Sequence, residues 1–129
     1  MLTNYVKNWL ARADEDIKTI QLLLKEEEGH PNPVCFHAQQ AGEKYLKGFL
    51  AYHDLHVRKI HDLEILIDDC GKIDKSFEEL RDEAEFLNQF YTESRYPDDY
   101  IEFSVDDAEK AYEAAKKIKD FVLSKVKIS

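Results

Sequence analysis

The fold of this chain is decided by residues 31–50, which read PNPVCFHAQQAGEKYLKGFL. Apolar side chains recur there in steps of three and four, at Val34, Ala38, Ala41, Tyr45 and Phe49. That spacing is typical of one face of an amphipathic α-helix. We expect Asn32 to cap this helix, with Pro33 at the first helical position, where a missing N–H costs nothing. Close approach of a neighbouring helix is predicted from four small residues, Ala38, Ala41, Gly42 and Gly48.

A long helix is predicted before this stretch and a short one after it. The first is capped by Asn4 and ends at the turn formers of residues 29–33. Its apolar stripe comprises Val6, Trp9, Ala13, Ile17, Ile20 and Leu24. The short helix begins at residues 61–63 and ends near Gly71, so it is expected to connect longer elements.

Two further long helices complete the prediction. Ser76 and Glu79 form a candidate capping box for the first of them, which must end by Tyr96 because Pro97 follows. Its apolar positions are Phe77, Leu80, Ala84, Leu87 and Tyr91. Ser104 is expected to cap the last helix, which is acidic at its start and rich in lysine at its end, as the helix dipole favours.

Composition supports one helical domain over residues 1–129. The chain is 43% hydrophobic and 35% charged, with only four Gly and three Pro, which is too apolar for a disordered chain and too poor in turn formers for a many-stranded β fold. A length of 129 residues rarely divides into two cores. We therefore predict an all-α, antiparallel up-down bundle of four long helices and one short helix.

The charge and the cysteines restrict the class of protein. A formal charge of -9 argues against non-specific wrapping of nucleic acid. Cys35 and Cys70 are too few for a disulfide framework and favour free thiols in a reducing cytoplasm. No apolar run approaches the roughly 20 residues of a membrane span, and no signal peptide is evident. We expect no cofactor, and no metal at the single Glu27-x-x-His30 spacing, since di-iron bundles need two such pairs.

A basic island at residues 44–61 interrupts the acidic chain, with four basic residues against one acidic residue. Glu43 and Lys47 have the spacing of an ordinary surface ion pair, which leaves the paired glutamines Gln39 and Gln40 unexplained. Residues 58–61 add cations at a helix start, where free N–H groups can bind a phosphate. A solvated basic turn is the favoured interpretation of these cations, and an anion site is the alternative.

The order of these motifs resembles the HEPN domain, "higher eukaryotes and prokaryotes nucleotide-binding". The resemblance extends from about Tyr5 to Val122, and its motifs are Trp9-Leu10-x-x-Ala13-x-x-Asp16-Ile17, then residues 35–47, His61-Asp62-Leu63 and Tyr91-x-x-Ser94-Arg95-Tyr96-Pro97. It implies a helical bundle that forms a homodimer. It also implies a toxin-antitoxin-like system in which small prokaryotic members accompany a minimal nucleotidyltransferase.

Many HEPN proteins are metal-independent ribonucleases with an Arg, four to six residues, then a His. None of the four arginines here has a His at that distance, and Arg58 has only two residues before His61. The resemblance therefore favours a binding protein over an enzyme. Its site positions, which would take a nucleotide, RNA or the partner nucleotidyltransferase, are Gln40, Glu43, Lys44, Lys47, His61, Arg95 and Tyr96.

Two alternatives stay open. One is a ribonuclease with an off-pattern site, in which His61 acts with Arg58 or Arg95. The other is a purely structural dimerisation module, because fourteen Phe and Tyr residues exceed what a small bundle core needs to bury.

Overall fold

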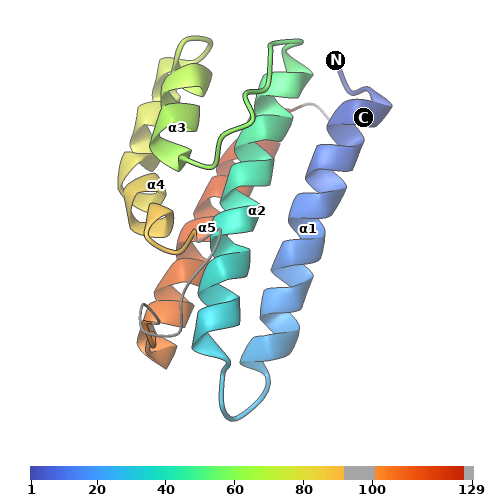
Figure 1. The fold of residues 1–129 in the computed structure, drawn as a ribbon. Helices are drawn as coiled ribbons and strands as arrows, with labels where there is room; N and C mark the ends of the chain where they lie inside the picture. The colour runs from blue at the N-terminus through green and yellow to red at the C-terminus, as the bar shows by residue number, and fades with distance from the viewer. Residues whose placement is uncertain (92–100, 127–129) are drawn as a thin grey trace.

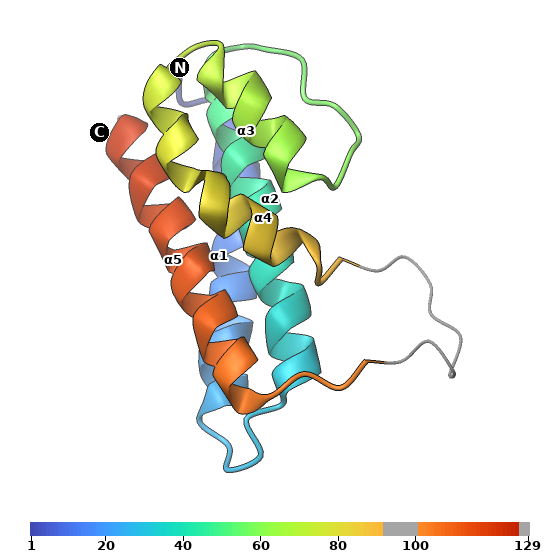
Figure 2. The same cartoon turned by 90° about the vertical axis from the view of Figure 1, so that its left-hand side faces the viewer.

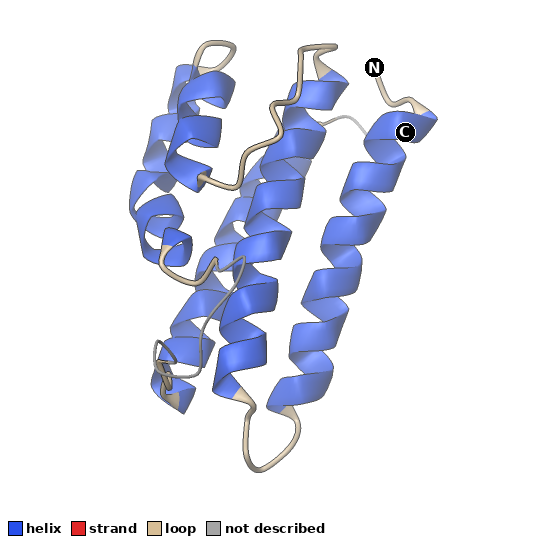
Figure 3. Ribbon diagram, in the orientation of Figure 1, coloured by secondary structure: helices blue, strands red, loops and turns tan. Residues whose placement is uncertain are grey.

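The computed structural model describes residues 1–91 and 101–126, and all regular elements in these ranges are helical (Figure 3). Four long segments alternate in direction (Figures 1 and 2). They are α1 (Asn4–Leu24), α2 (Pro31–Tyr52), the continuous pair η1 (Lys75–Leu80) and α4 (Arg81–Asn88), and α5 (Val105–Lys125). The short helix α3 (Leu63–Gly71) connects the second segment to the third. The predicted all-α bundle of four long segments and one short helix is confirmed.

The start of α1 differs by one residue from the prediction. Thr3, not Asn4, is the N-cap, and its hydroxyl accepts a hydrogen bond from the Val6 N–H at 3.2 Å. Both residue types cap helices well, so the sequence could not separate them. Ser104 caps α5 as predicted, and forms a full capping box with Asp107.

The start of α2 also departs from the prediction. The helix begins at Pro31, after His30 in a left-handed conformation with φ of 42°, and His30 makes no side-chain cap. Asn32 does not cap the helix. Its amide donates to the Ile101 carbonyl at 2.6 Å and accepts from the Phe103 N–H at 2.9 Å. Asn32 therefore ties the segment before α5 to the start of α2.

The third long segment begins with a six-residue 3₁₀ helix before it continues as α4. Its N-cap is Asp74, which accepts hydrogen bonds from the N–H and the hydroxyl of Ser76, so the predicted capping box of Ser76 and Glu79 is wrong. Hydrogen bonds from Ser76 and Lys125 hold the pKa of Asp74 at about 2. Asp74 thereby also joins this segment to the end of α5 through an ion pair of 3.0 Å.

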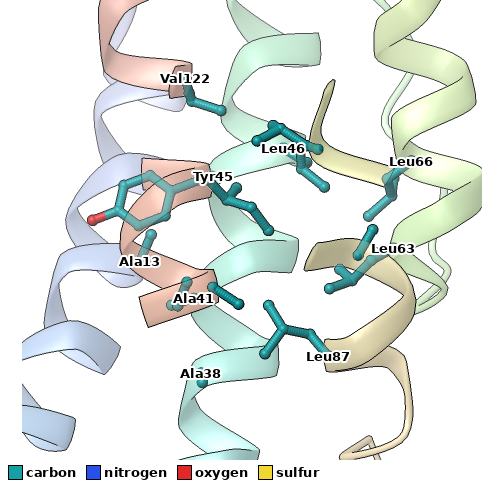
Figure 4. Close-up of a cluster of buried hydrophobic side chains, with 14 of the residues drawn as sticks. Ala13, Ala38, Ala41, Tyr45, Leu46, Leu63, Leu66, Leu87 and Val122 are labelled. Atoms are coloured by element: carbon teal, nitrogen blue, oxygen red, sulfur yellow. The ribbon is translucent and has the colours of Figure 1, made fainter. Parts of the chain in front are cut away.

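The helix α2 lies at the centre of the core, and side chains from all the other α-helices meet around it (Figure 4). Tyr45, Leu46 and Phe49 are fully buried on it. A Cβ at Gly42 would meet side chains of α3, α4 and α5 at 3.2–3.4 Å, so this glycine permits the close packing that the sequence predicted. No helix of residues 1–91 and 101–126 is both long and apolar enough to cross a membrane.

Both cysteines are free, as predicted, and the structure shows that both are buried. Burial raises the pKa of the Cys35 thiol to about 12 and raises that of Cys70 further. Because the thiolate is the reactive form, we expect both thiols to be inert in the folded protein.

Gly48 sets the distance between α1 and α2. A Cβ there would lie 2.9 Å from Leu10 Cδ2 and 3.4 Å from Trp9 Cβ. We expect Gly48→Val to lower the free energy of unfolding by about 1–3 kcal/mol, because the added methyl groups push the helices apart. The measurement is urea denaturation, with Gly71→Ala as control, since a Cβ at Gly71 meets nothing within 4 Å. Equal stability of Gly48→Val and the wild type would show that α1 tolerates the added volume.

Candidate functional site

Glu43 is the centre of a buried polar cluster on α2. Its side chain accepts a hydrogen bond from Lys47 Nζ at 3.0 Å through one oxygen and lies 2.9 Å from His61 Nδ1 through the other. Glu43 and Lys47 are only 4% and 5% exposed. The interpretation as a surface ion pair is therefore wrong. These residues and Gln39 form what we call the His61 cluster.

The glutamines hold His61 in place. Gln39 donates to the His61 carbonyl at 3.0 Å and lies 3.4 Å from Glu43 Oε1. Gln40 donates to Gln39 Oε1 at 2.7 Å. The predicted site omits Gln39, although the sequence contains its i,i+4 spacing to Glu43. The paired glutamines, which helix packing alone did not explain, therefore hydrogen-bond the residues of the His61 cluster.

The exposed part of the cluster is the His61 ring. Its side chain is 41% exposed and stacks on Tyr91, with ring centroids 4.1 Å apart and planes at 22°. Because Glu43 accepts from Nδ1–H, the neutral ring carries its lone pair on Nε2. The predicted residues Arg95 and Tyr96, which follow Tyr91 along the chain, lie outside the described residues.

Lys47 contacts α1 as well as Glu43. Its ammonium lies 5.7 Å from the centroid of the Trp9 ring, within range of a cation–π interaction. Trp9 in turn packs edge-on against Tyr5, which is 56% exposed. The buried charge of Lys47 is thus compensated by one carboxylate and one aromatic face.

A second cluster on α1 and α2 repeats the same chemistry. Asp16 is 7% exposed and lies 2.8 Å from His37 Nδ1 and 2.7 Å from Lys44 Nζ. As in the His61 cluster, one buried carboxylate is shared by an imidazole and an ammonium. The predicted ligand residue Lys44 is therefore already paired, although its side chain remains 23% exposed.

Protonation of Asp16 should uncouple this second cluster. Burial by itself raises the pKa of Asp16, but hydrogen bonds from His37 and Lys44, with their charges, outweigh it and lower the pKa below its ordinary value of 3.8. A carboxyl with a depressed folded-state pKa stabilises the fold above its unfolded-state pKa, and this stabilisation disappears as the pH falls through the folded-state pKa.

We therefore expect Asp16→Asn to lower the free energy of unfolding by about 1–3 kcal/mol at neutral pH. Its deficit relative to the wild type should shrink as the pH falls below about 4. Urea denaturation between neutral pH and about pH 3 measures this. The control is Glu15→Gln on the exposed side of α1. A deficit that stays constant down to the lowest pH would contradict the assigned role of Asp16.

Arg58, a predicted catalytic candidate, faces α3. Its guanidinium donates to both carboxylate oxygens of Asp69, at 2.9 and 2.6 Å. The helix start of α3, where the alternative interpretation placed an anion site, is also occupied by the protein's own groups. Asp62 accepts from the N–H groups of Glu64 and Ile65, and Asn88 accepts from that of Leu63. These bonds favour the predicted solvated basic turn over the alternative of an anion site.

At the end of α1, possible ligand atoms of Glu26, Glu28 and His30 lie within 4.8 Å of one another. Glu27, which the sequence pattern paired with His30, is not among them. Glu26 and Glu28 are exposed, and Glu26 hydrogen-bonds His30. This arrangement is that of a charged helix end.

Comparison with known proteins agrees with the geometry. The family model of the HEPN domain matches residues 6–126. The crystal structure of TT1696 from Thermus thermophilus is similar, with 29% identity, a TM-score of 0.83 and coverage of 96% of this chain and 100% of that chain. So is ST0689, an archaeal HEPN homologue, with 26% identity, a TM-score of 0.76 and coverage of 95% and 98%. A search of curated proteins gives no match. Because the family model spans nearly the whole chain, the protein belongs to the HEPN domain family.

Proposed function

We propose that this HEPN protein binds a nucleotide at the His61 cluster without cleaving RNA. The observation that carries the proposal is the exposed imidazole of His61, which is held by buried Glu43 and stacked on Tyr91. Nucleobases stack on such aromatic surfaces, and each stacked base contributes about 1–3 kcal/mol to the binding free energy. The lone pair of His61 Nε2 lies in the ring plane, so it can accept a hydrogen bond from a ligand donor at the edge of the ring.

The phosphates of the nucleotide would be met by Lys44 and Arg95. An ammonium has three N–H donors, so the bond from Lys44 to Asp16 leaves donors for a ligand. Lys47 is buried and has a structural role in this proposal. Arg95 lies outside the described residues and is proposed from the sequence motif alone.

Calorimetry with ATP, GTP and their di- and monophosphates tests the proposal. We expect saturable heat with at least one nucleotide, and at least about tenfold weaker binding by His61→Ala. The matched control is His56→Ala, an exposed histidine of the same α2–α3 connection. No heat from any nucleotide, or equal weakening in both variants, would reject nucleotide binding at His61.

The biological setting proposed is a homodimer that works with a minimal nucleotidyltransferase, as the HEPN resemblance suggests. Exposed Tyr5 and half-buried Trp9 supply an aromatic surface on α1 for a second copy. Light scattering at high micromolar concentration tests the dimer. A monomer would contradict it, and a dimer that binds no nucleotide would support the purely structural module instead.

A ribonuclease is the second candidate, because the Glu43–His61 contact also suits a general base. A buried carboxylate that fixes an imidazole through Nδ1 leaves Nε2 free to take a proton. Arg58, which would stabilise the phosphate, is bonded to Asp69. Incubation with total RNA and EDTA tests this activity. Cleavage that His61→Ala removes and His56→Ala keeps would replace the binding proposal, and unchanged RNA would eliminate the ribonuclease.

A further inference from the structure

A groove of about 720 Å³ lies between α4 and α5, on elements that do not carry His61. The two helices lie side by side (Figure 2). Phe86 of α4 and Ala114 of α5 contribute apolar surface to the groove. Phe86 is only partly buried and packs edge-on against Phe90. The groove therefore offers apolar surface that the core does not cover.

Carboxylates surround this apolar surface. Five carboxylates and two lysines line the groove, so it carries an excess of negative charge. Both lysines are already engaged, Lys110 with Asp106 at 3.1 Å and Lys117 with Glu83 at 3.2 Å. The other three carboxylates of the groove are Asp82, Glu109 and Glu113. They form no ion pair with any residue of 1–91 and 101–126.

Glu83 adds an incomplete hydrogen-bond set to the groove. Lys117 lies near its Oε2, whereas Oε1 is buried and has no hydrogen-bond partner among the described residues. A buried carboxylate oxygen without a donor costs free energy, and a lysine or arginine of a partner can supply the donor after a small rotation of the side chain.

We propose that this groove is a docking surface for a basic amphipathic helix of a partner protein. The groove follows α5 from Asp106 to Lys117, about 17 Å, which matches a helix of three turns. An amphipathic helix places apolar anchors on one stripe, to lie over Phe86 and Ala114. Lysine or arginine residues flanking that stripe then meet Asp82, Glu109 and Glu113. The carboxylates therefore favour a basic partner. The apolar surface favours an amphipathic helix over a polycation without apolar side chains.

The probe is a labelled peptide of about 14 residues, with leucine at i, i+3, i+4 and i+7 spacing and lysine at the flanking positions. A second peptide has serine in place of each leucine and the same charge. Fluorescence anisotropy with the full chain should give at least about tenfold tighter binding of the leucine peptide. Equal affinity of the two peptides would overturn the proposal, because only net charge would then be recognised.

Matched variants locate the binding. Glu109→Gln with Glu113→Gln removes two groove charges, and Glu15→Gln with Asp54→Asn removes two exposed charges, on α1 and after α2, that do not line the groove. We expect at least about fivefold weaker binding for the groove variant and less than about twofold for the control. Equal weakening in both would overturn the proposal. Sedimentation velocity tests whether the groove is instead occupied by a second copy of this chain. A change of oligomeric state in the groove variant would also overturn the proposal.

Discussion

Replacing Glu43 with Ala is expected to lower the free energy of unfolding by about 3–5 kcal/mol, because it leaves the ammonium of Lys47 buried without its carboxylate. Lys47 is 5% exposed, and its ammonium bonds to Glu43 at 3.0 Å. The same change removes the hydrogen-bond partner of His61 Nδ1. Urea denaturation at neutral pH measures the loss.

The control for this prediction removes both charges together. Glu43→Leu with Lys47→Met fills the same space with apolar groups, and such replacements are often neutral or stabilising. The double variant should therefore be closer to the wild type than Glu43→Ala is. A loss below about 1 kcal/mol in Glu43→Ala would mean that Lys47 reaches water easily, which would contradict a buried cluster.

Phe77→Ala is the second large effect expected, also about 3–5 kcal/mol. Phe77 of η1 is fully buried between Phe49 of α2, with ring centroids 4.3 Å apart, and Phe121 of α5, at 4.9 Å. It thereby joins the third long segment to two others. Removing the ring leaves a cavity that fixed helices cannot fill.

Ile73→Ala is the matched control, since Ile73 lies just before η1 and is 37% exposed. We expect it to cost less than about 1 kcal/mol. Thermal or urea unfolding compares the two variants. If Phe77→Ala were no more destabilising than Ile73→Ala, η1 would not be an integral part of the bundle.

The helical order could be predicted because the apolar stripes of α1, α2 and α5 follow one period over 21 or 22 residues each. The 3₁₀ geometry of η1 could not, since the step from Phe77 to Leu80 suits both helix types. The chain neighbours of Asn32 predict a helix cap, because a cap depends on local sequence. Its partners Ile101 and Phe103 are 69 and 71 residues away.

The candidate site could be predicted in part, because only some of its features follow from local sequence. Residue type and spacing singled out Glu43, Lys47 and His61. Spacing could not distinguish a buried pair from a surface pair, because burial of Lys47 depends on Trp9 and other elements distant in the sequence. The sequence identifies Asp16 only as part of a motif, because its partner Lys44 is 28 residues away.

The most direct test of the central claim is NMR of the histidine side chains during titration with ATP and with GTP. In the free protein, His61 should be the tautomer with its proton on Nδ1, as the contact with Glu43 requires. A binding nucleotide should shift the ring signals of His61 and Tyr91 saturably and leave those of exposed His53 and His56 in place. Nucleotide binding with unchanged His61 signals, or no binding at millimolar concentration, would contradict the His61 cluster as the ligand site.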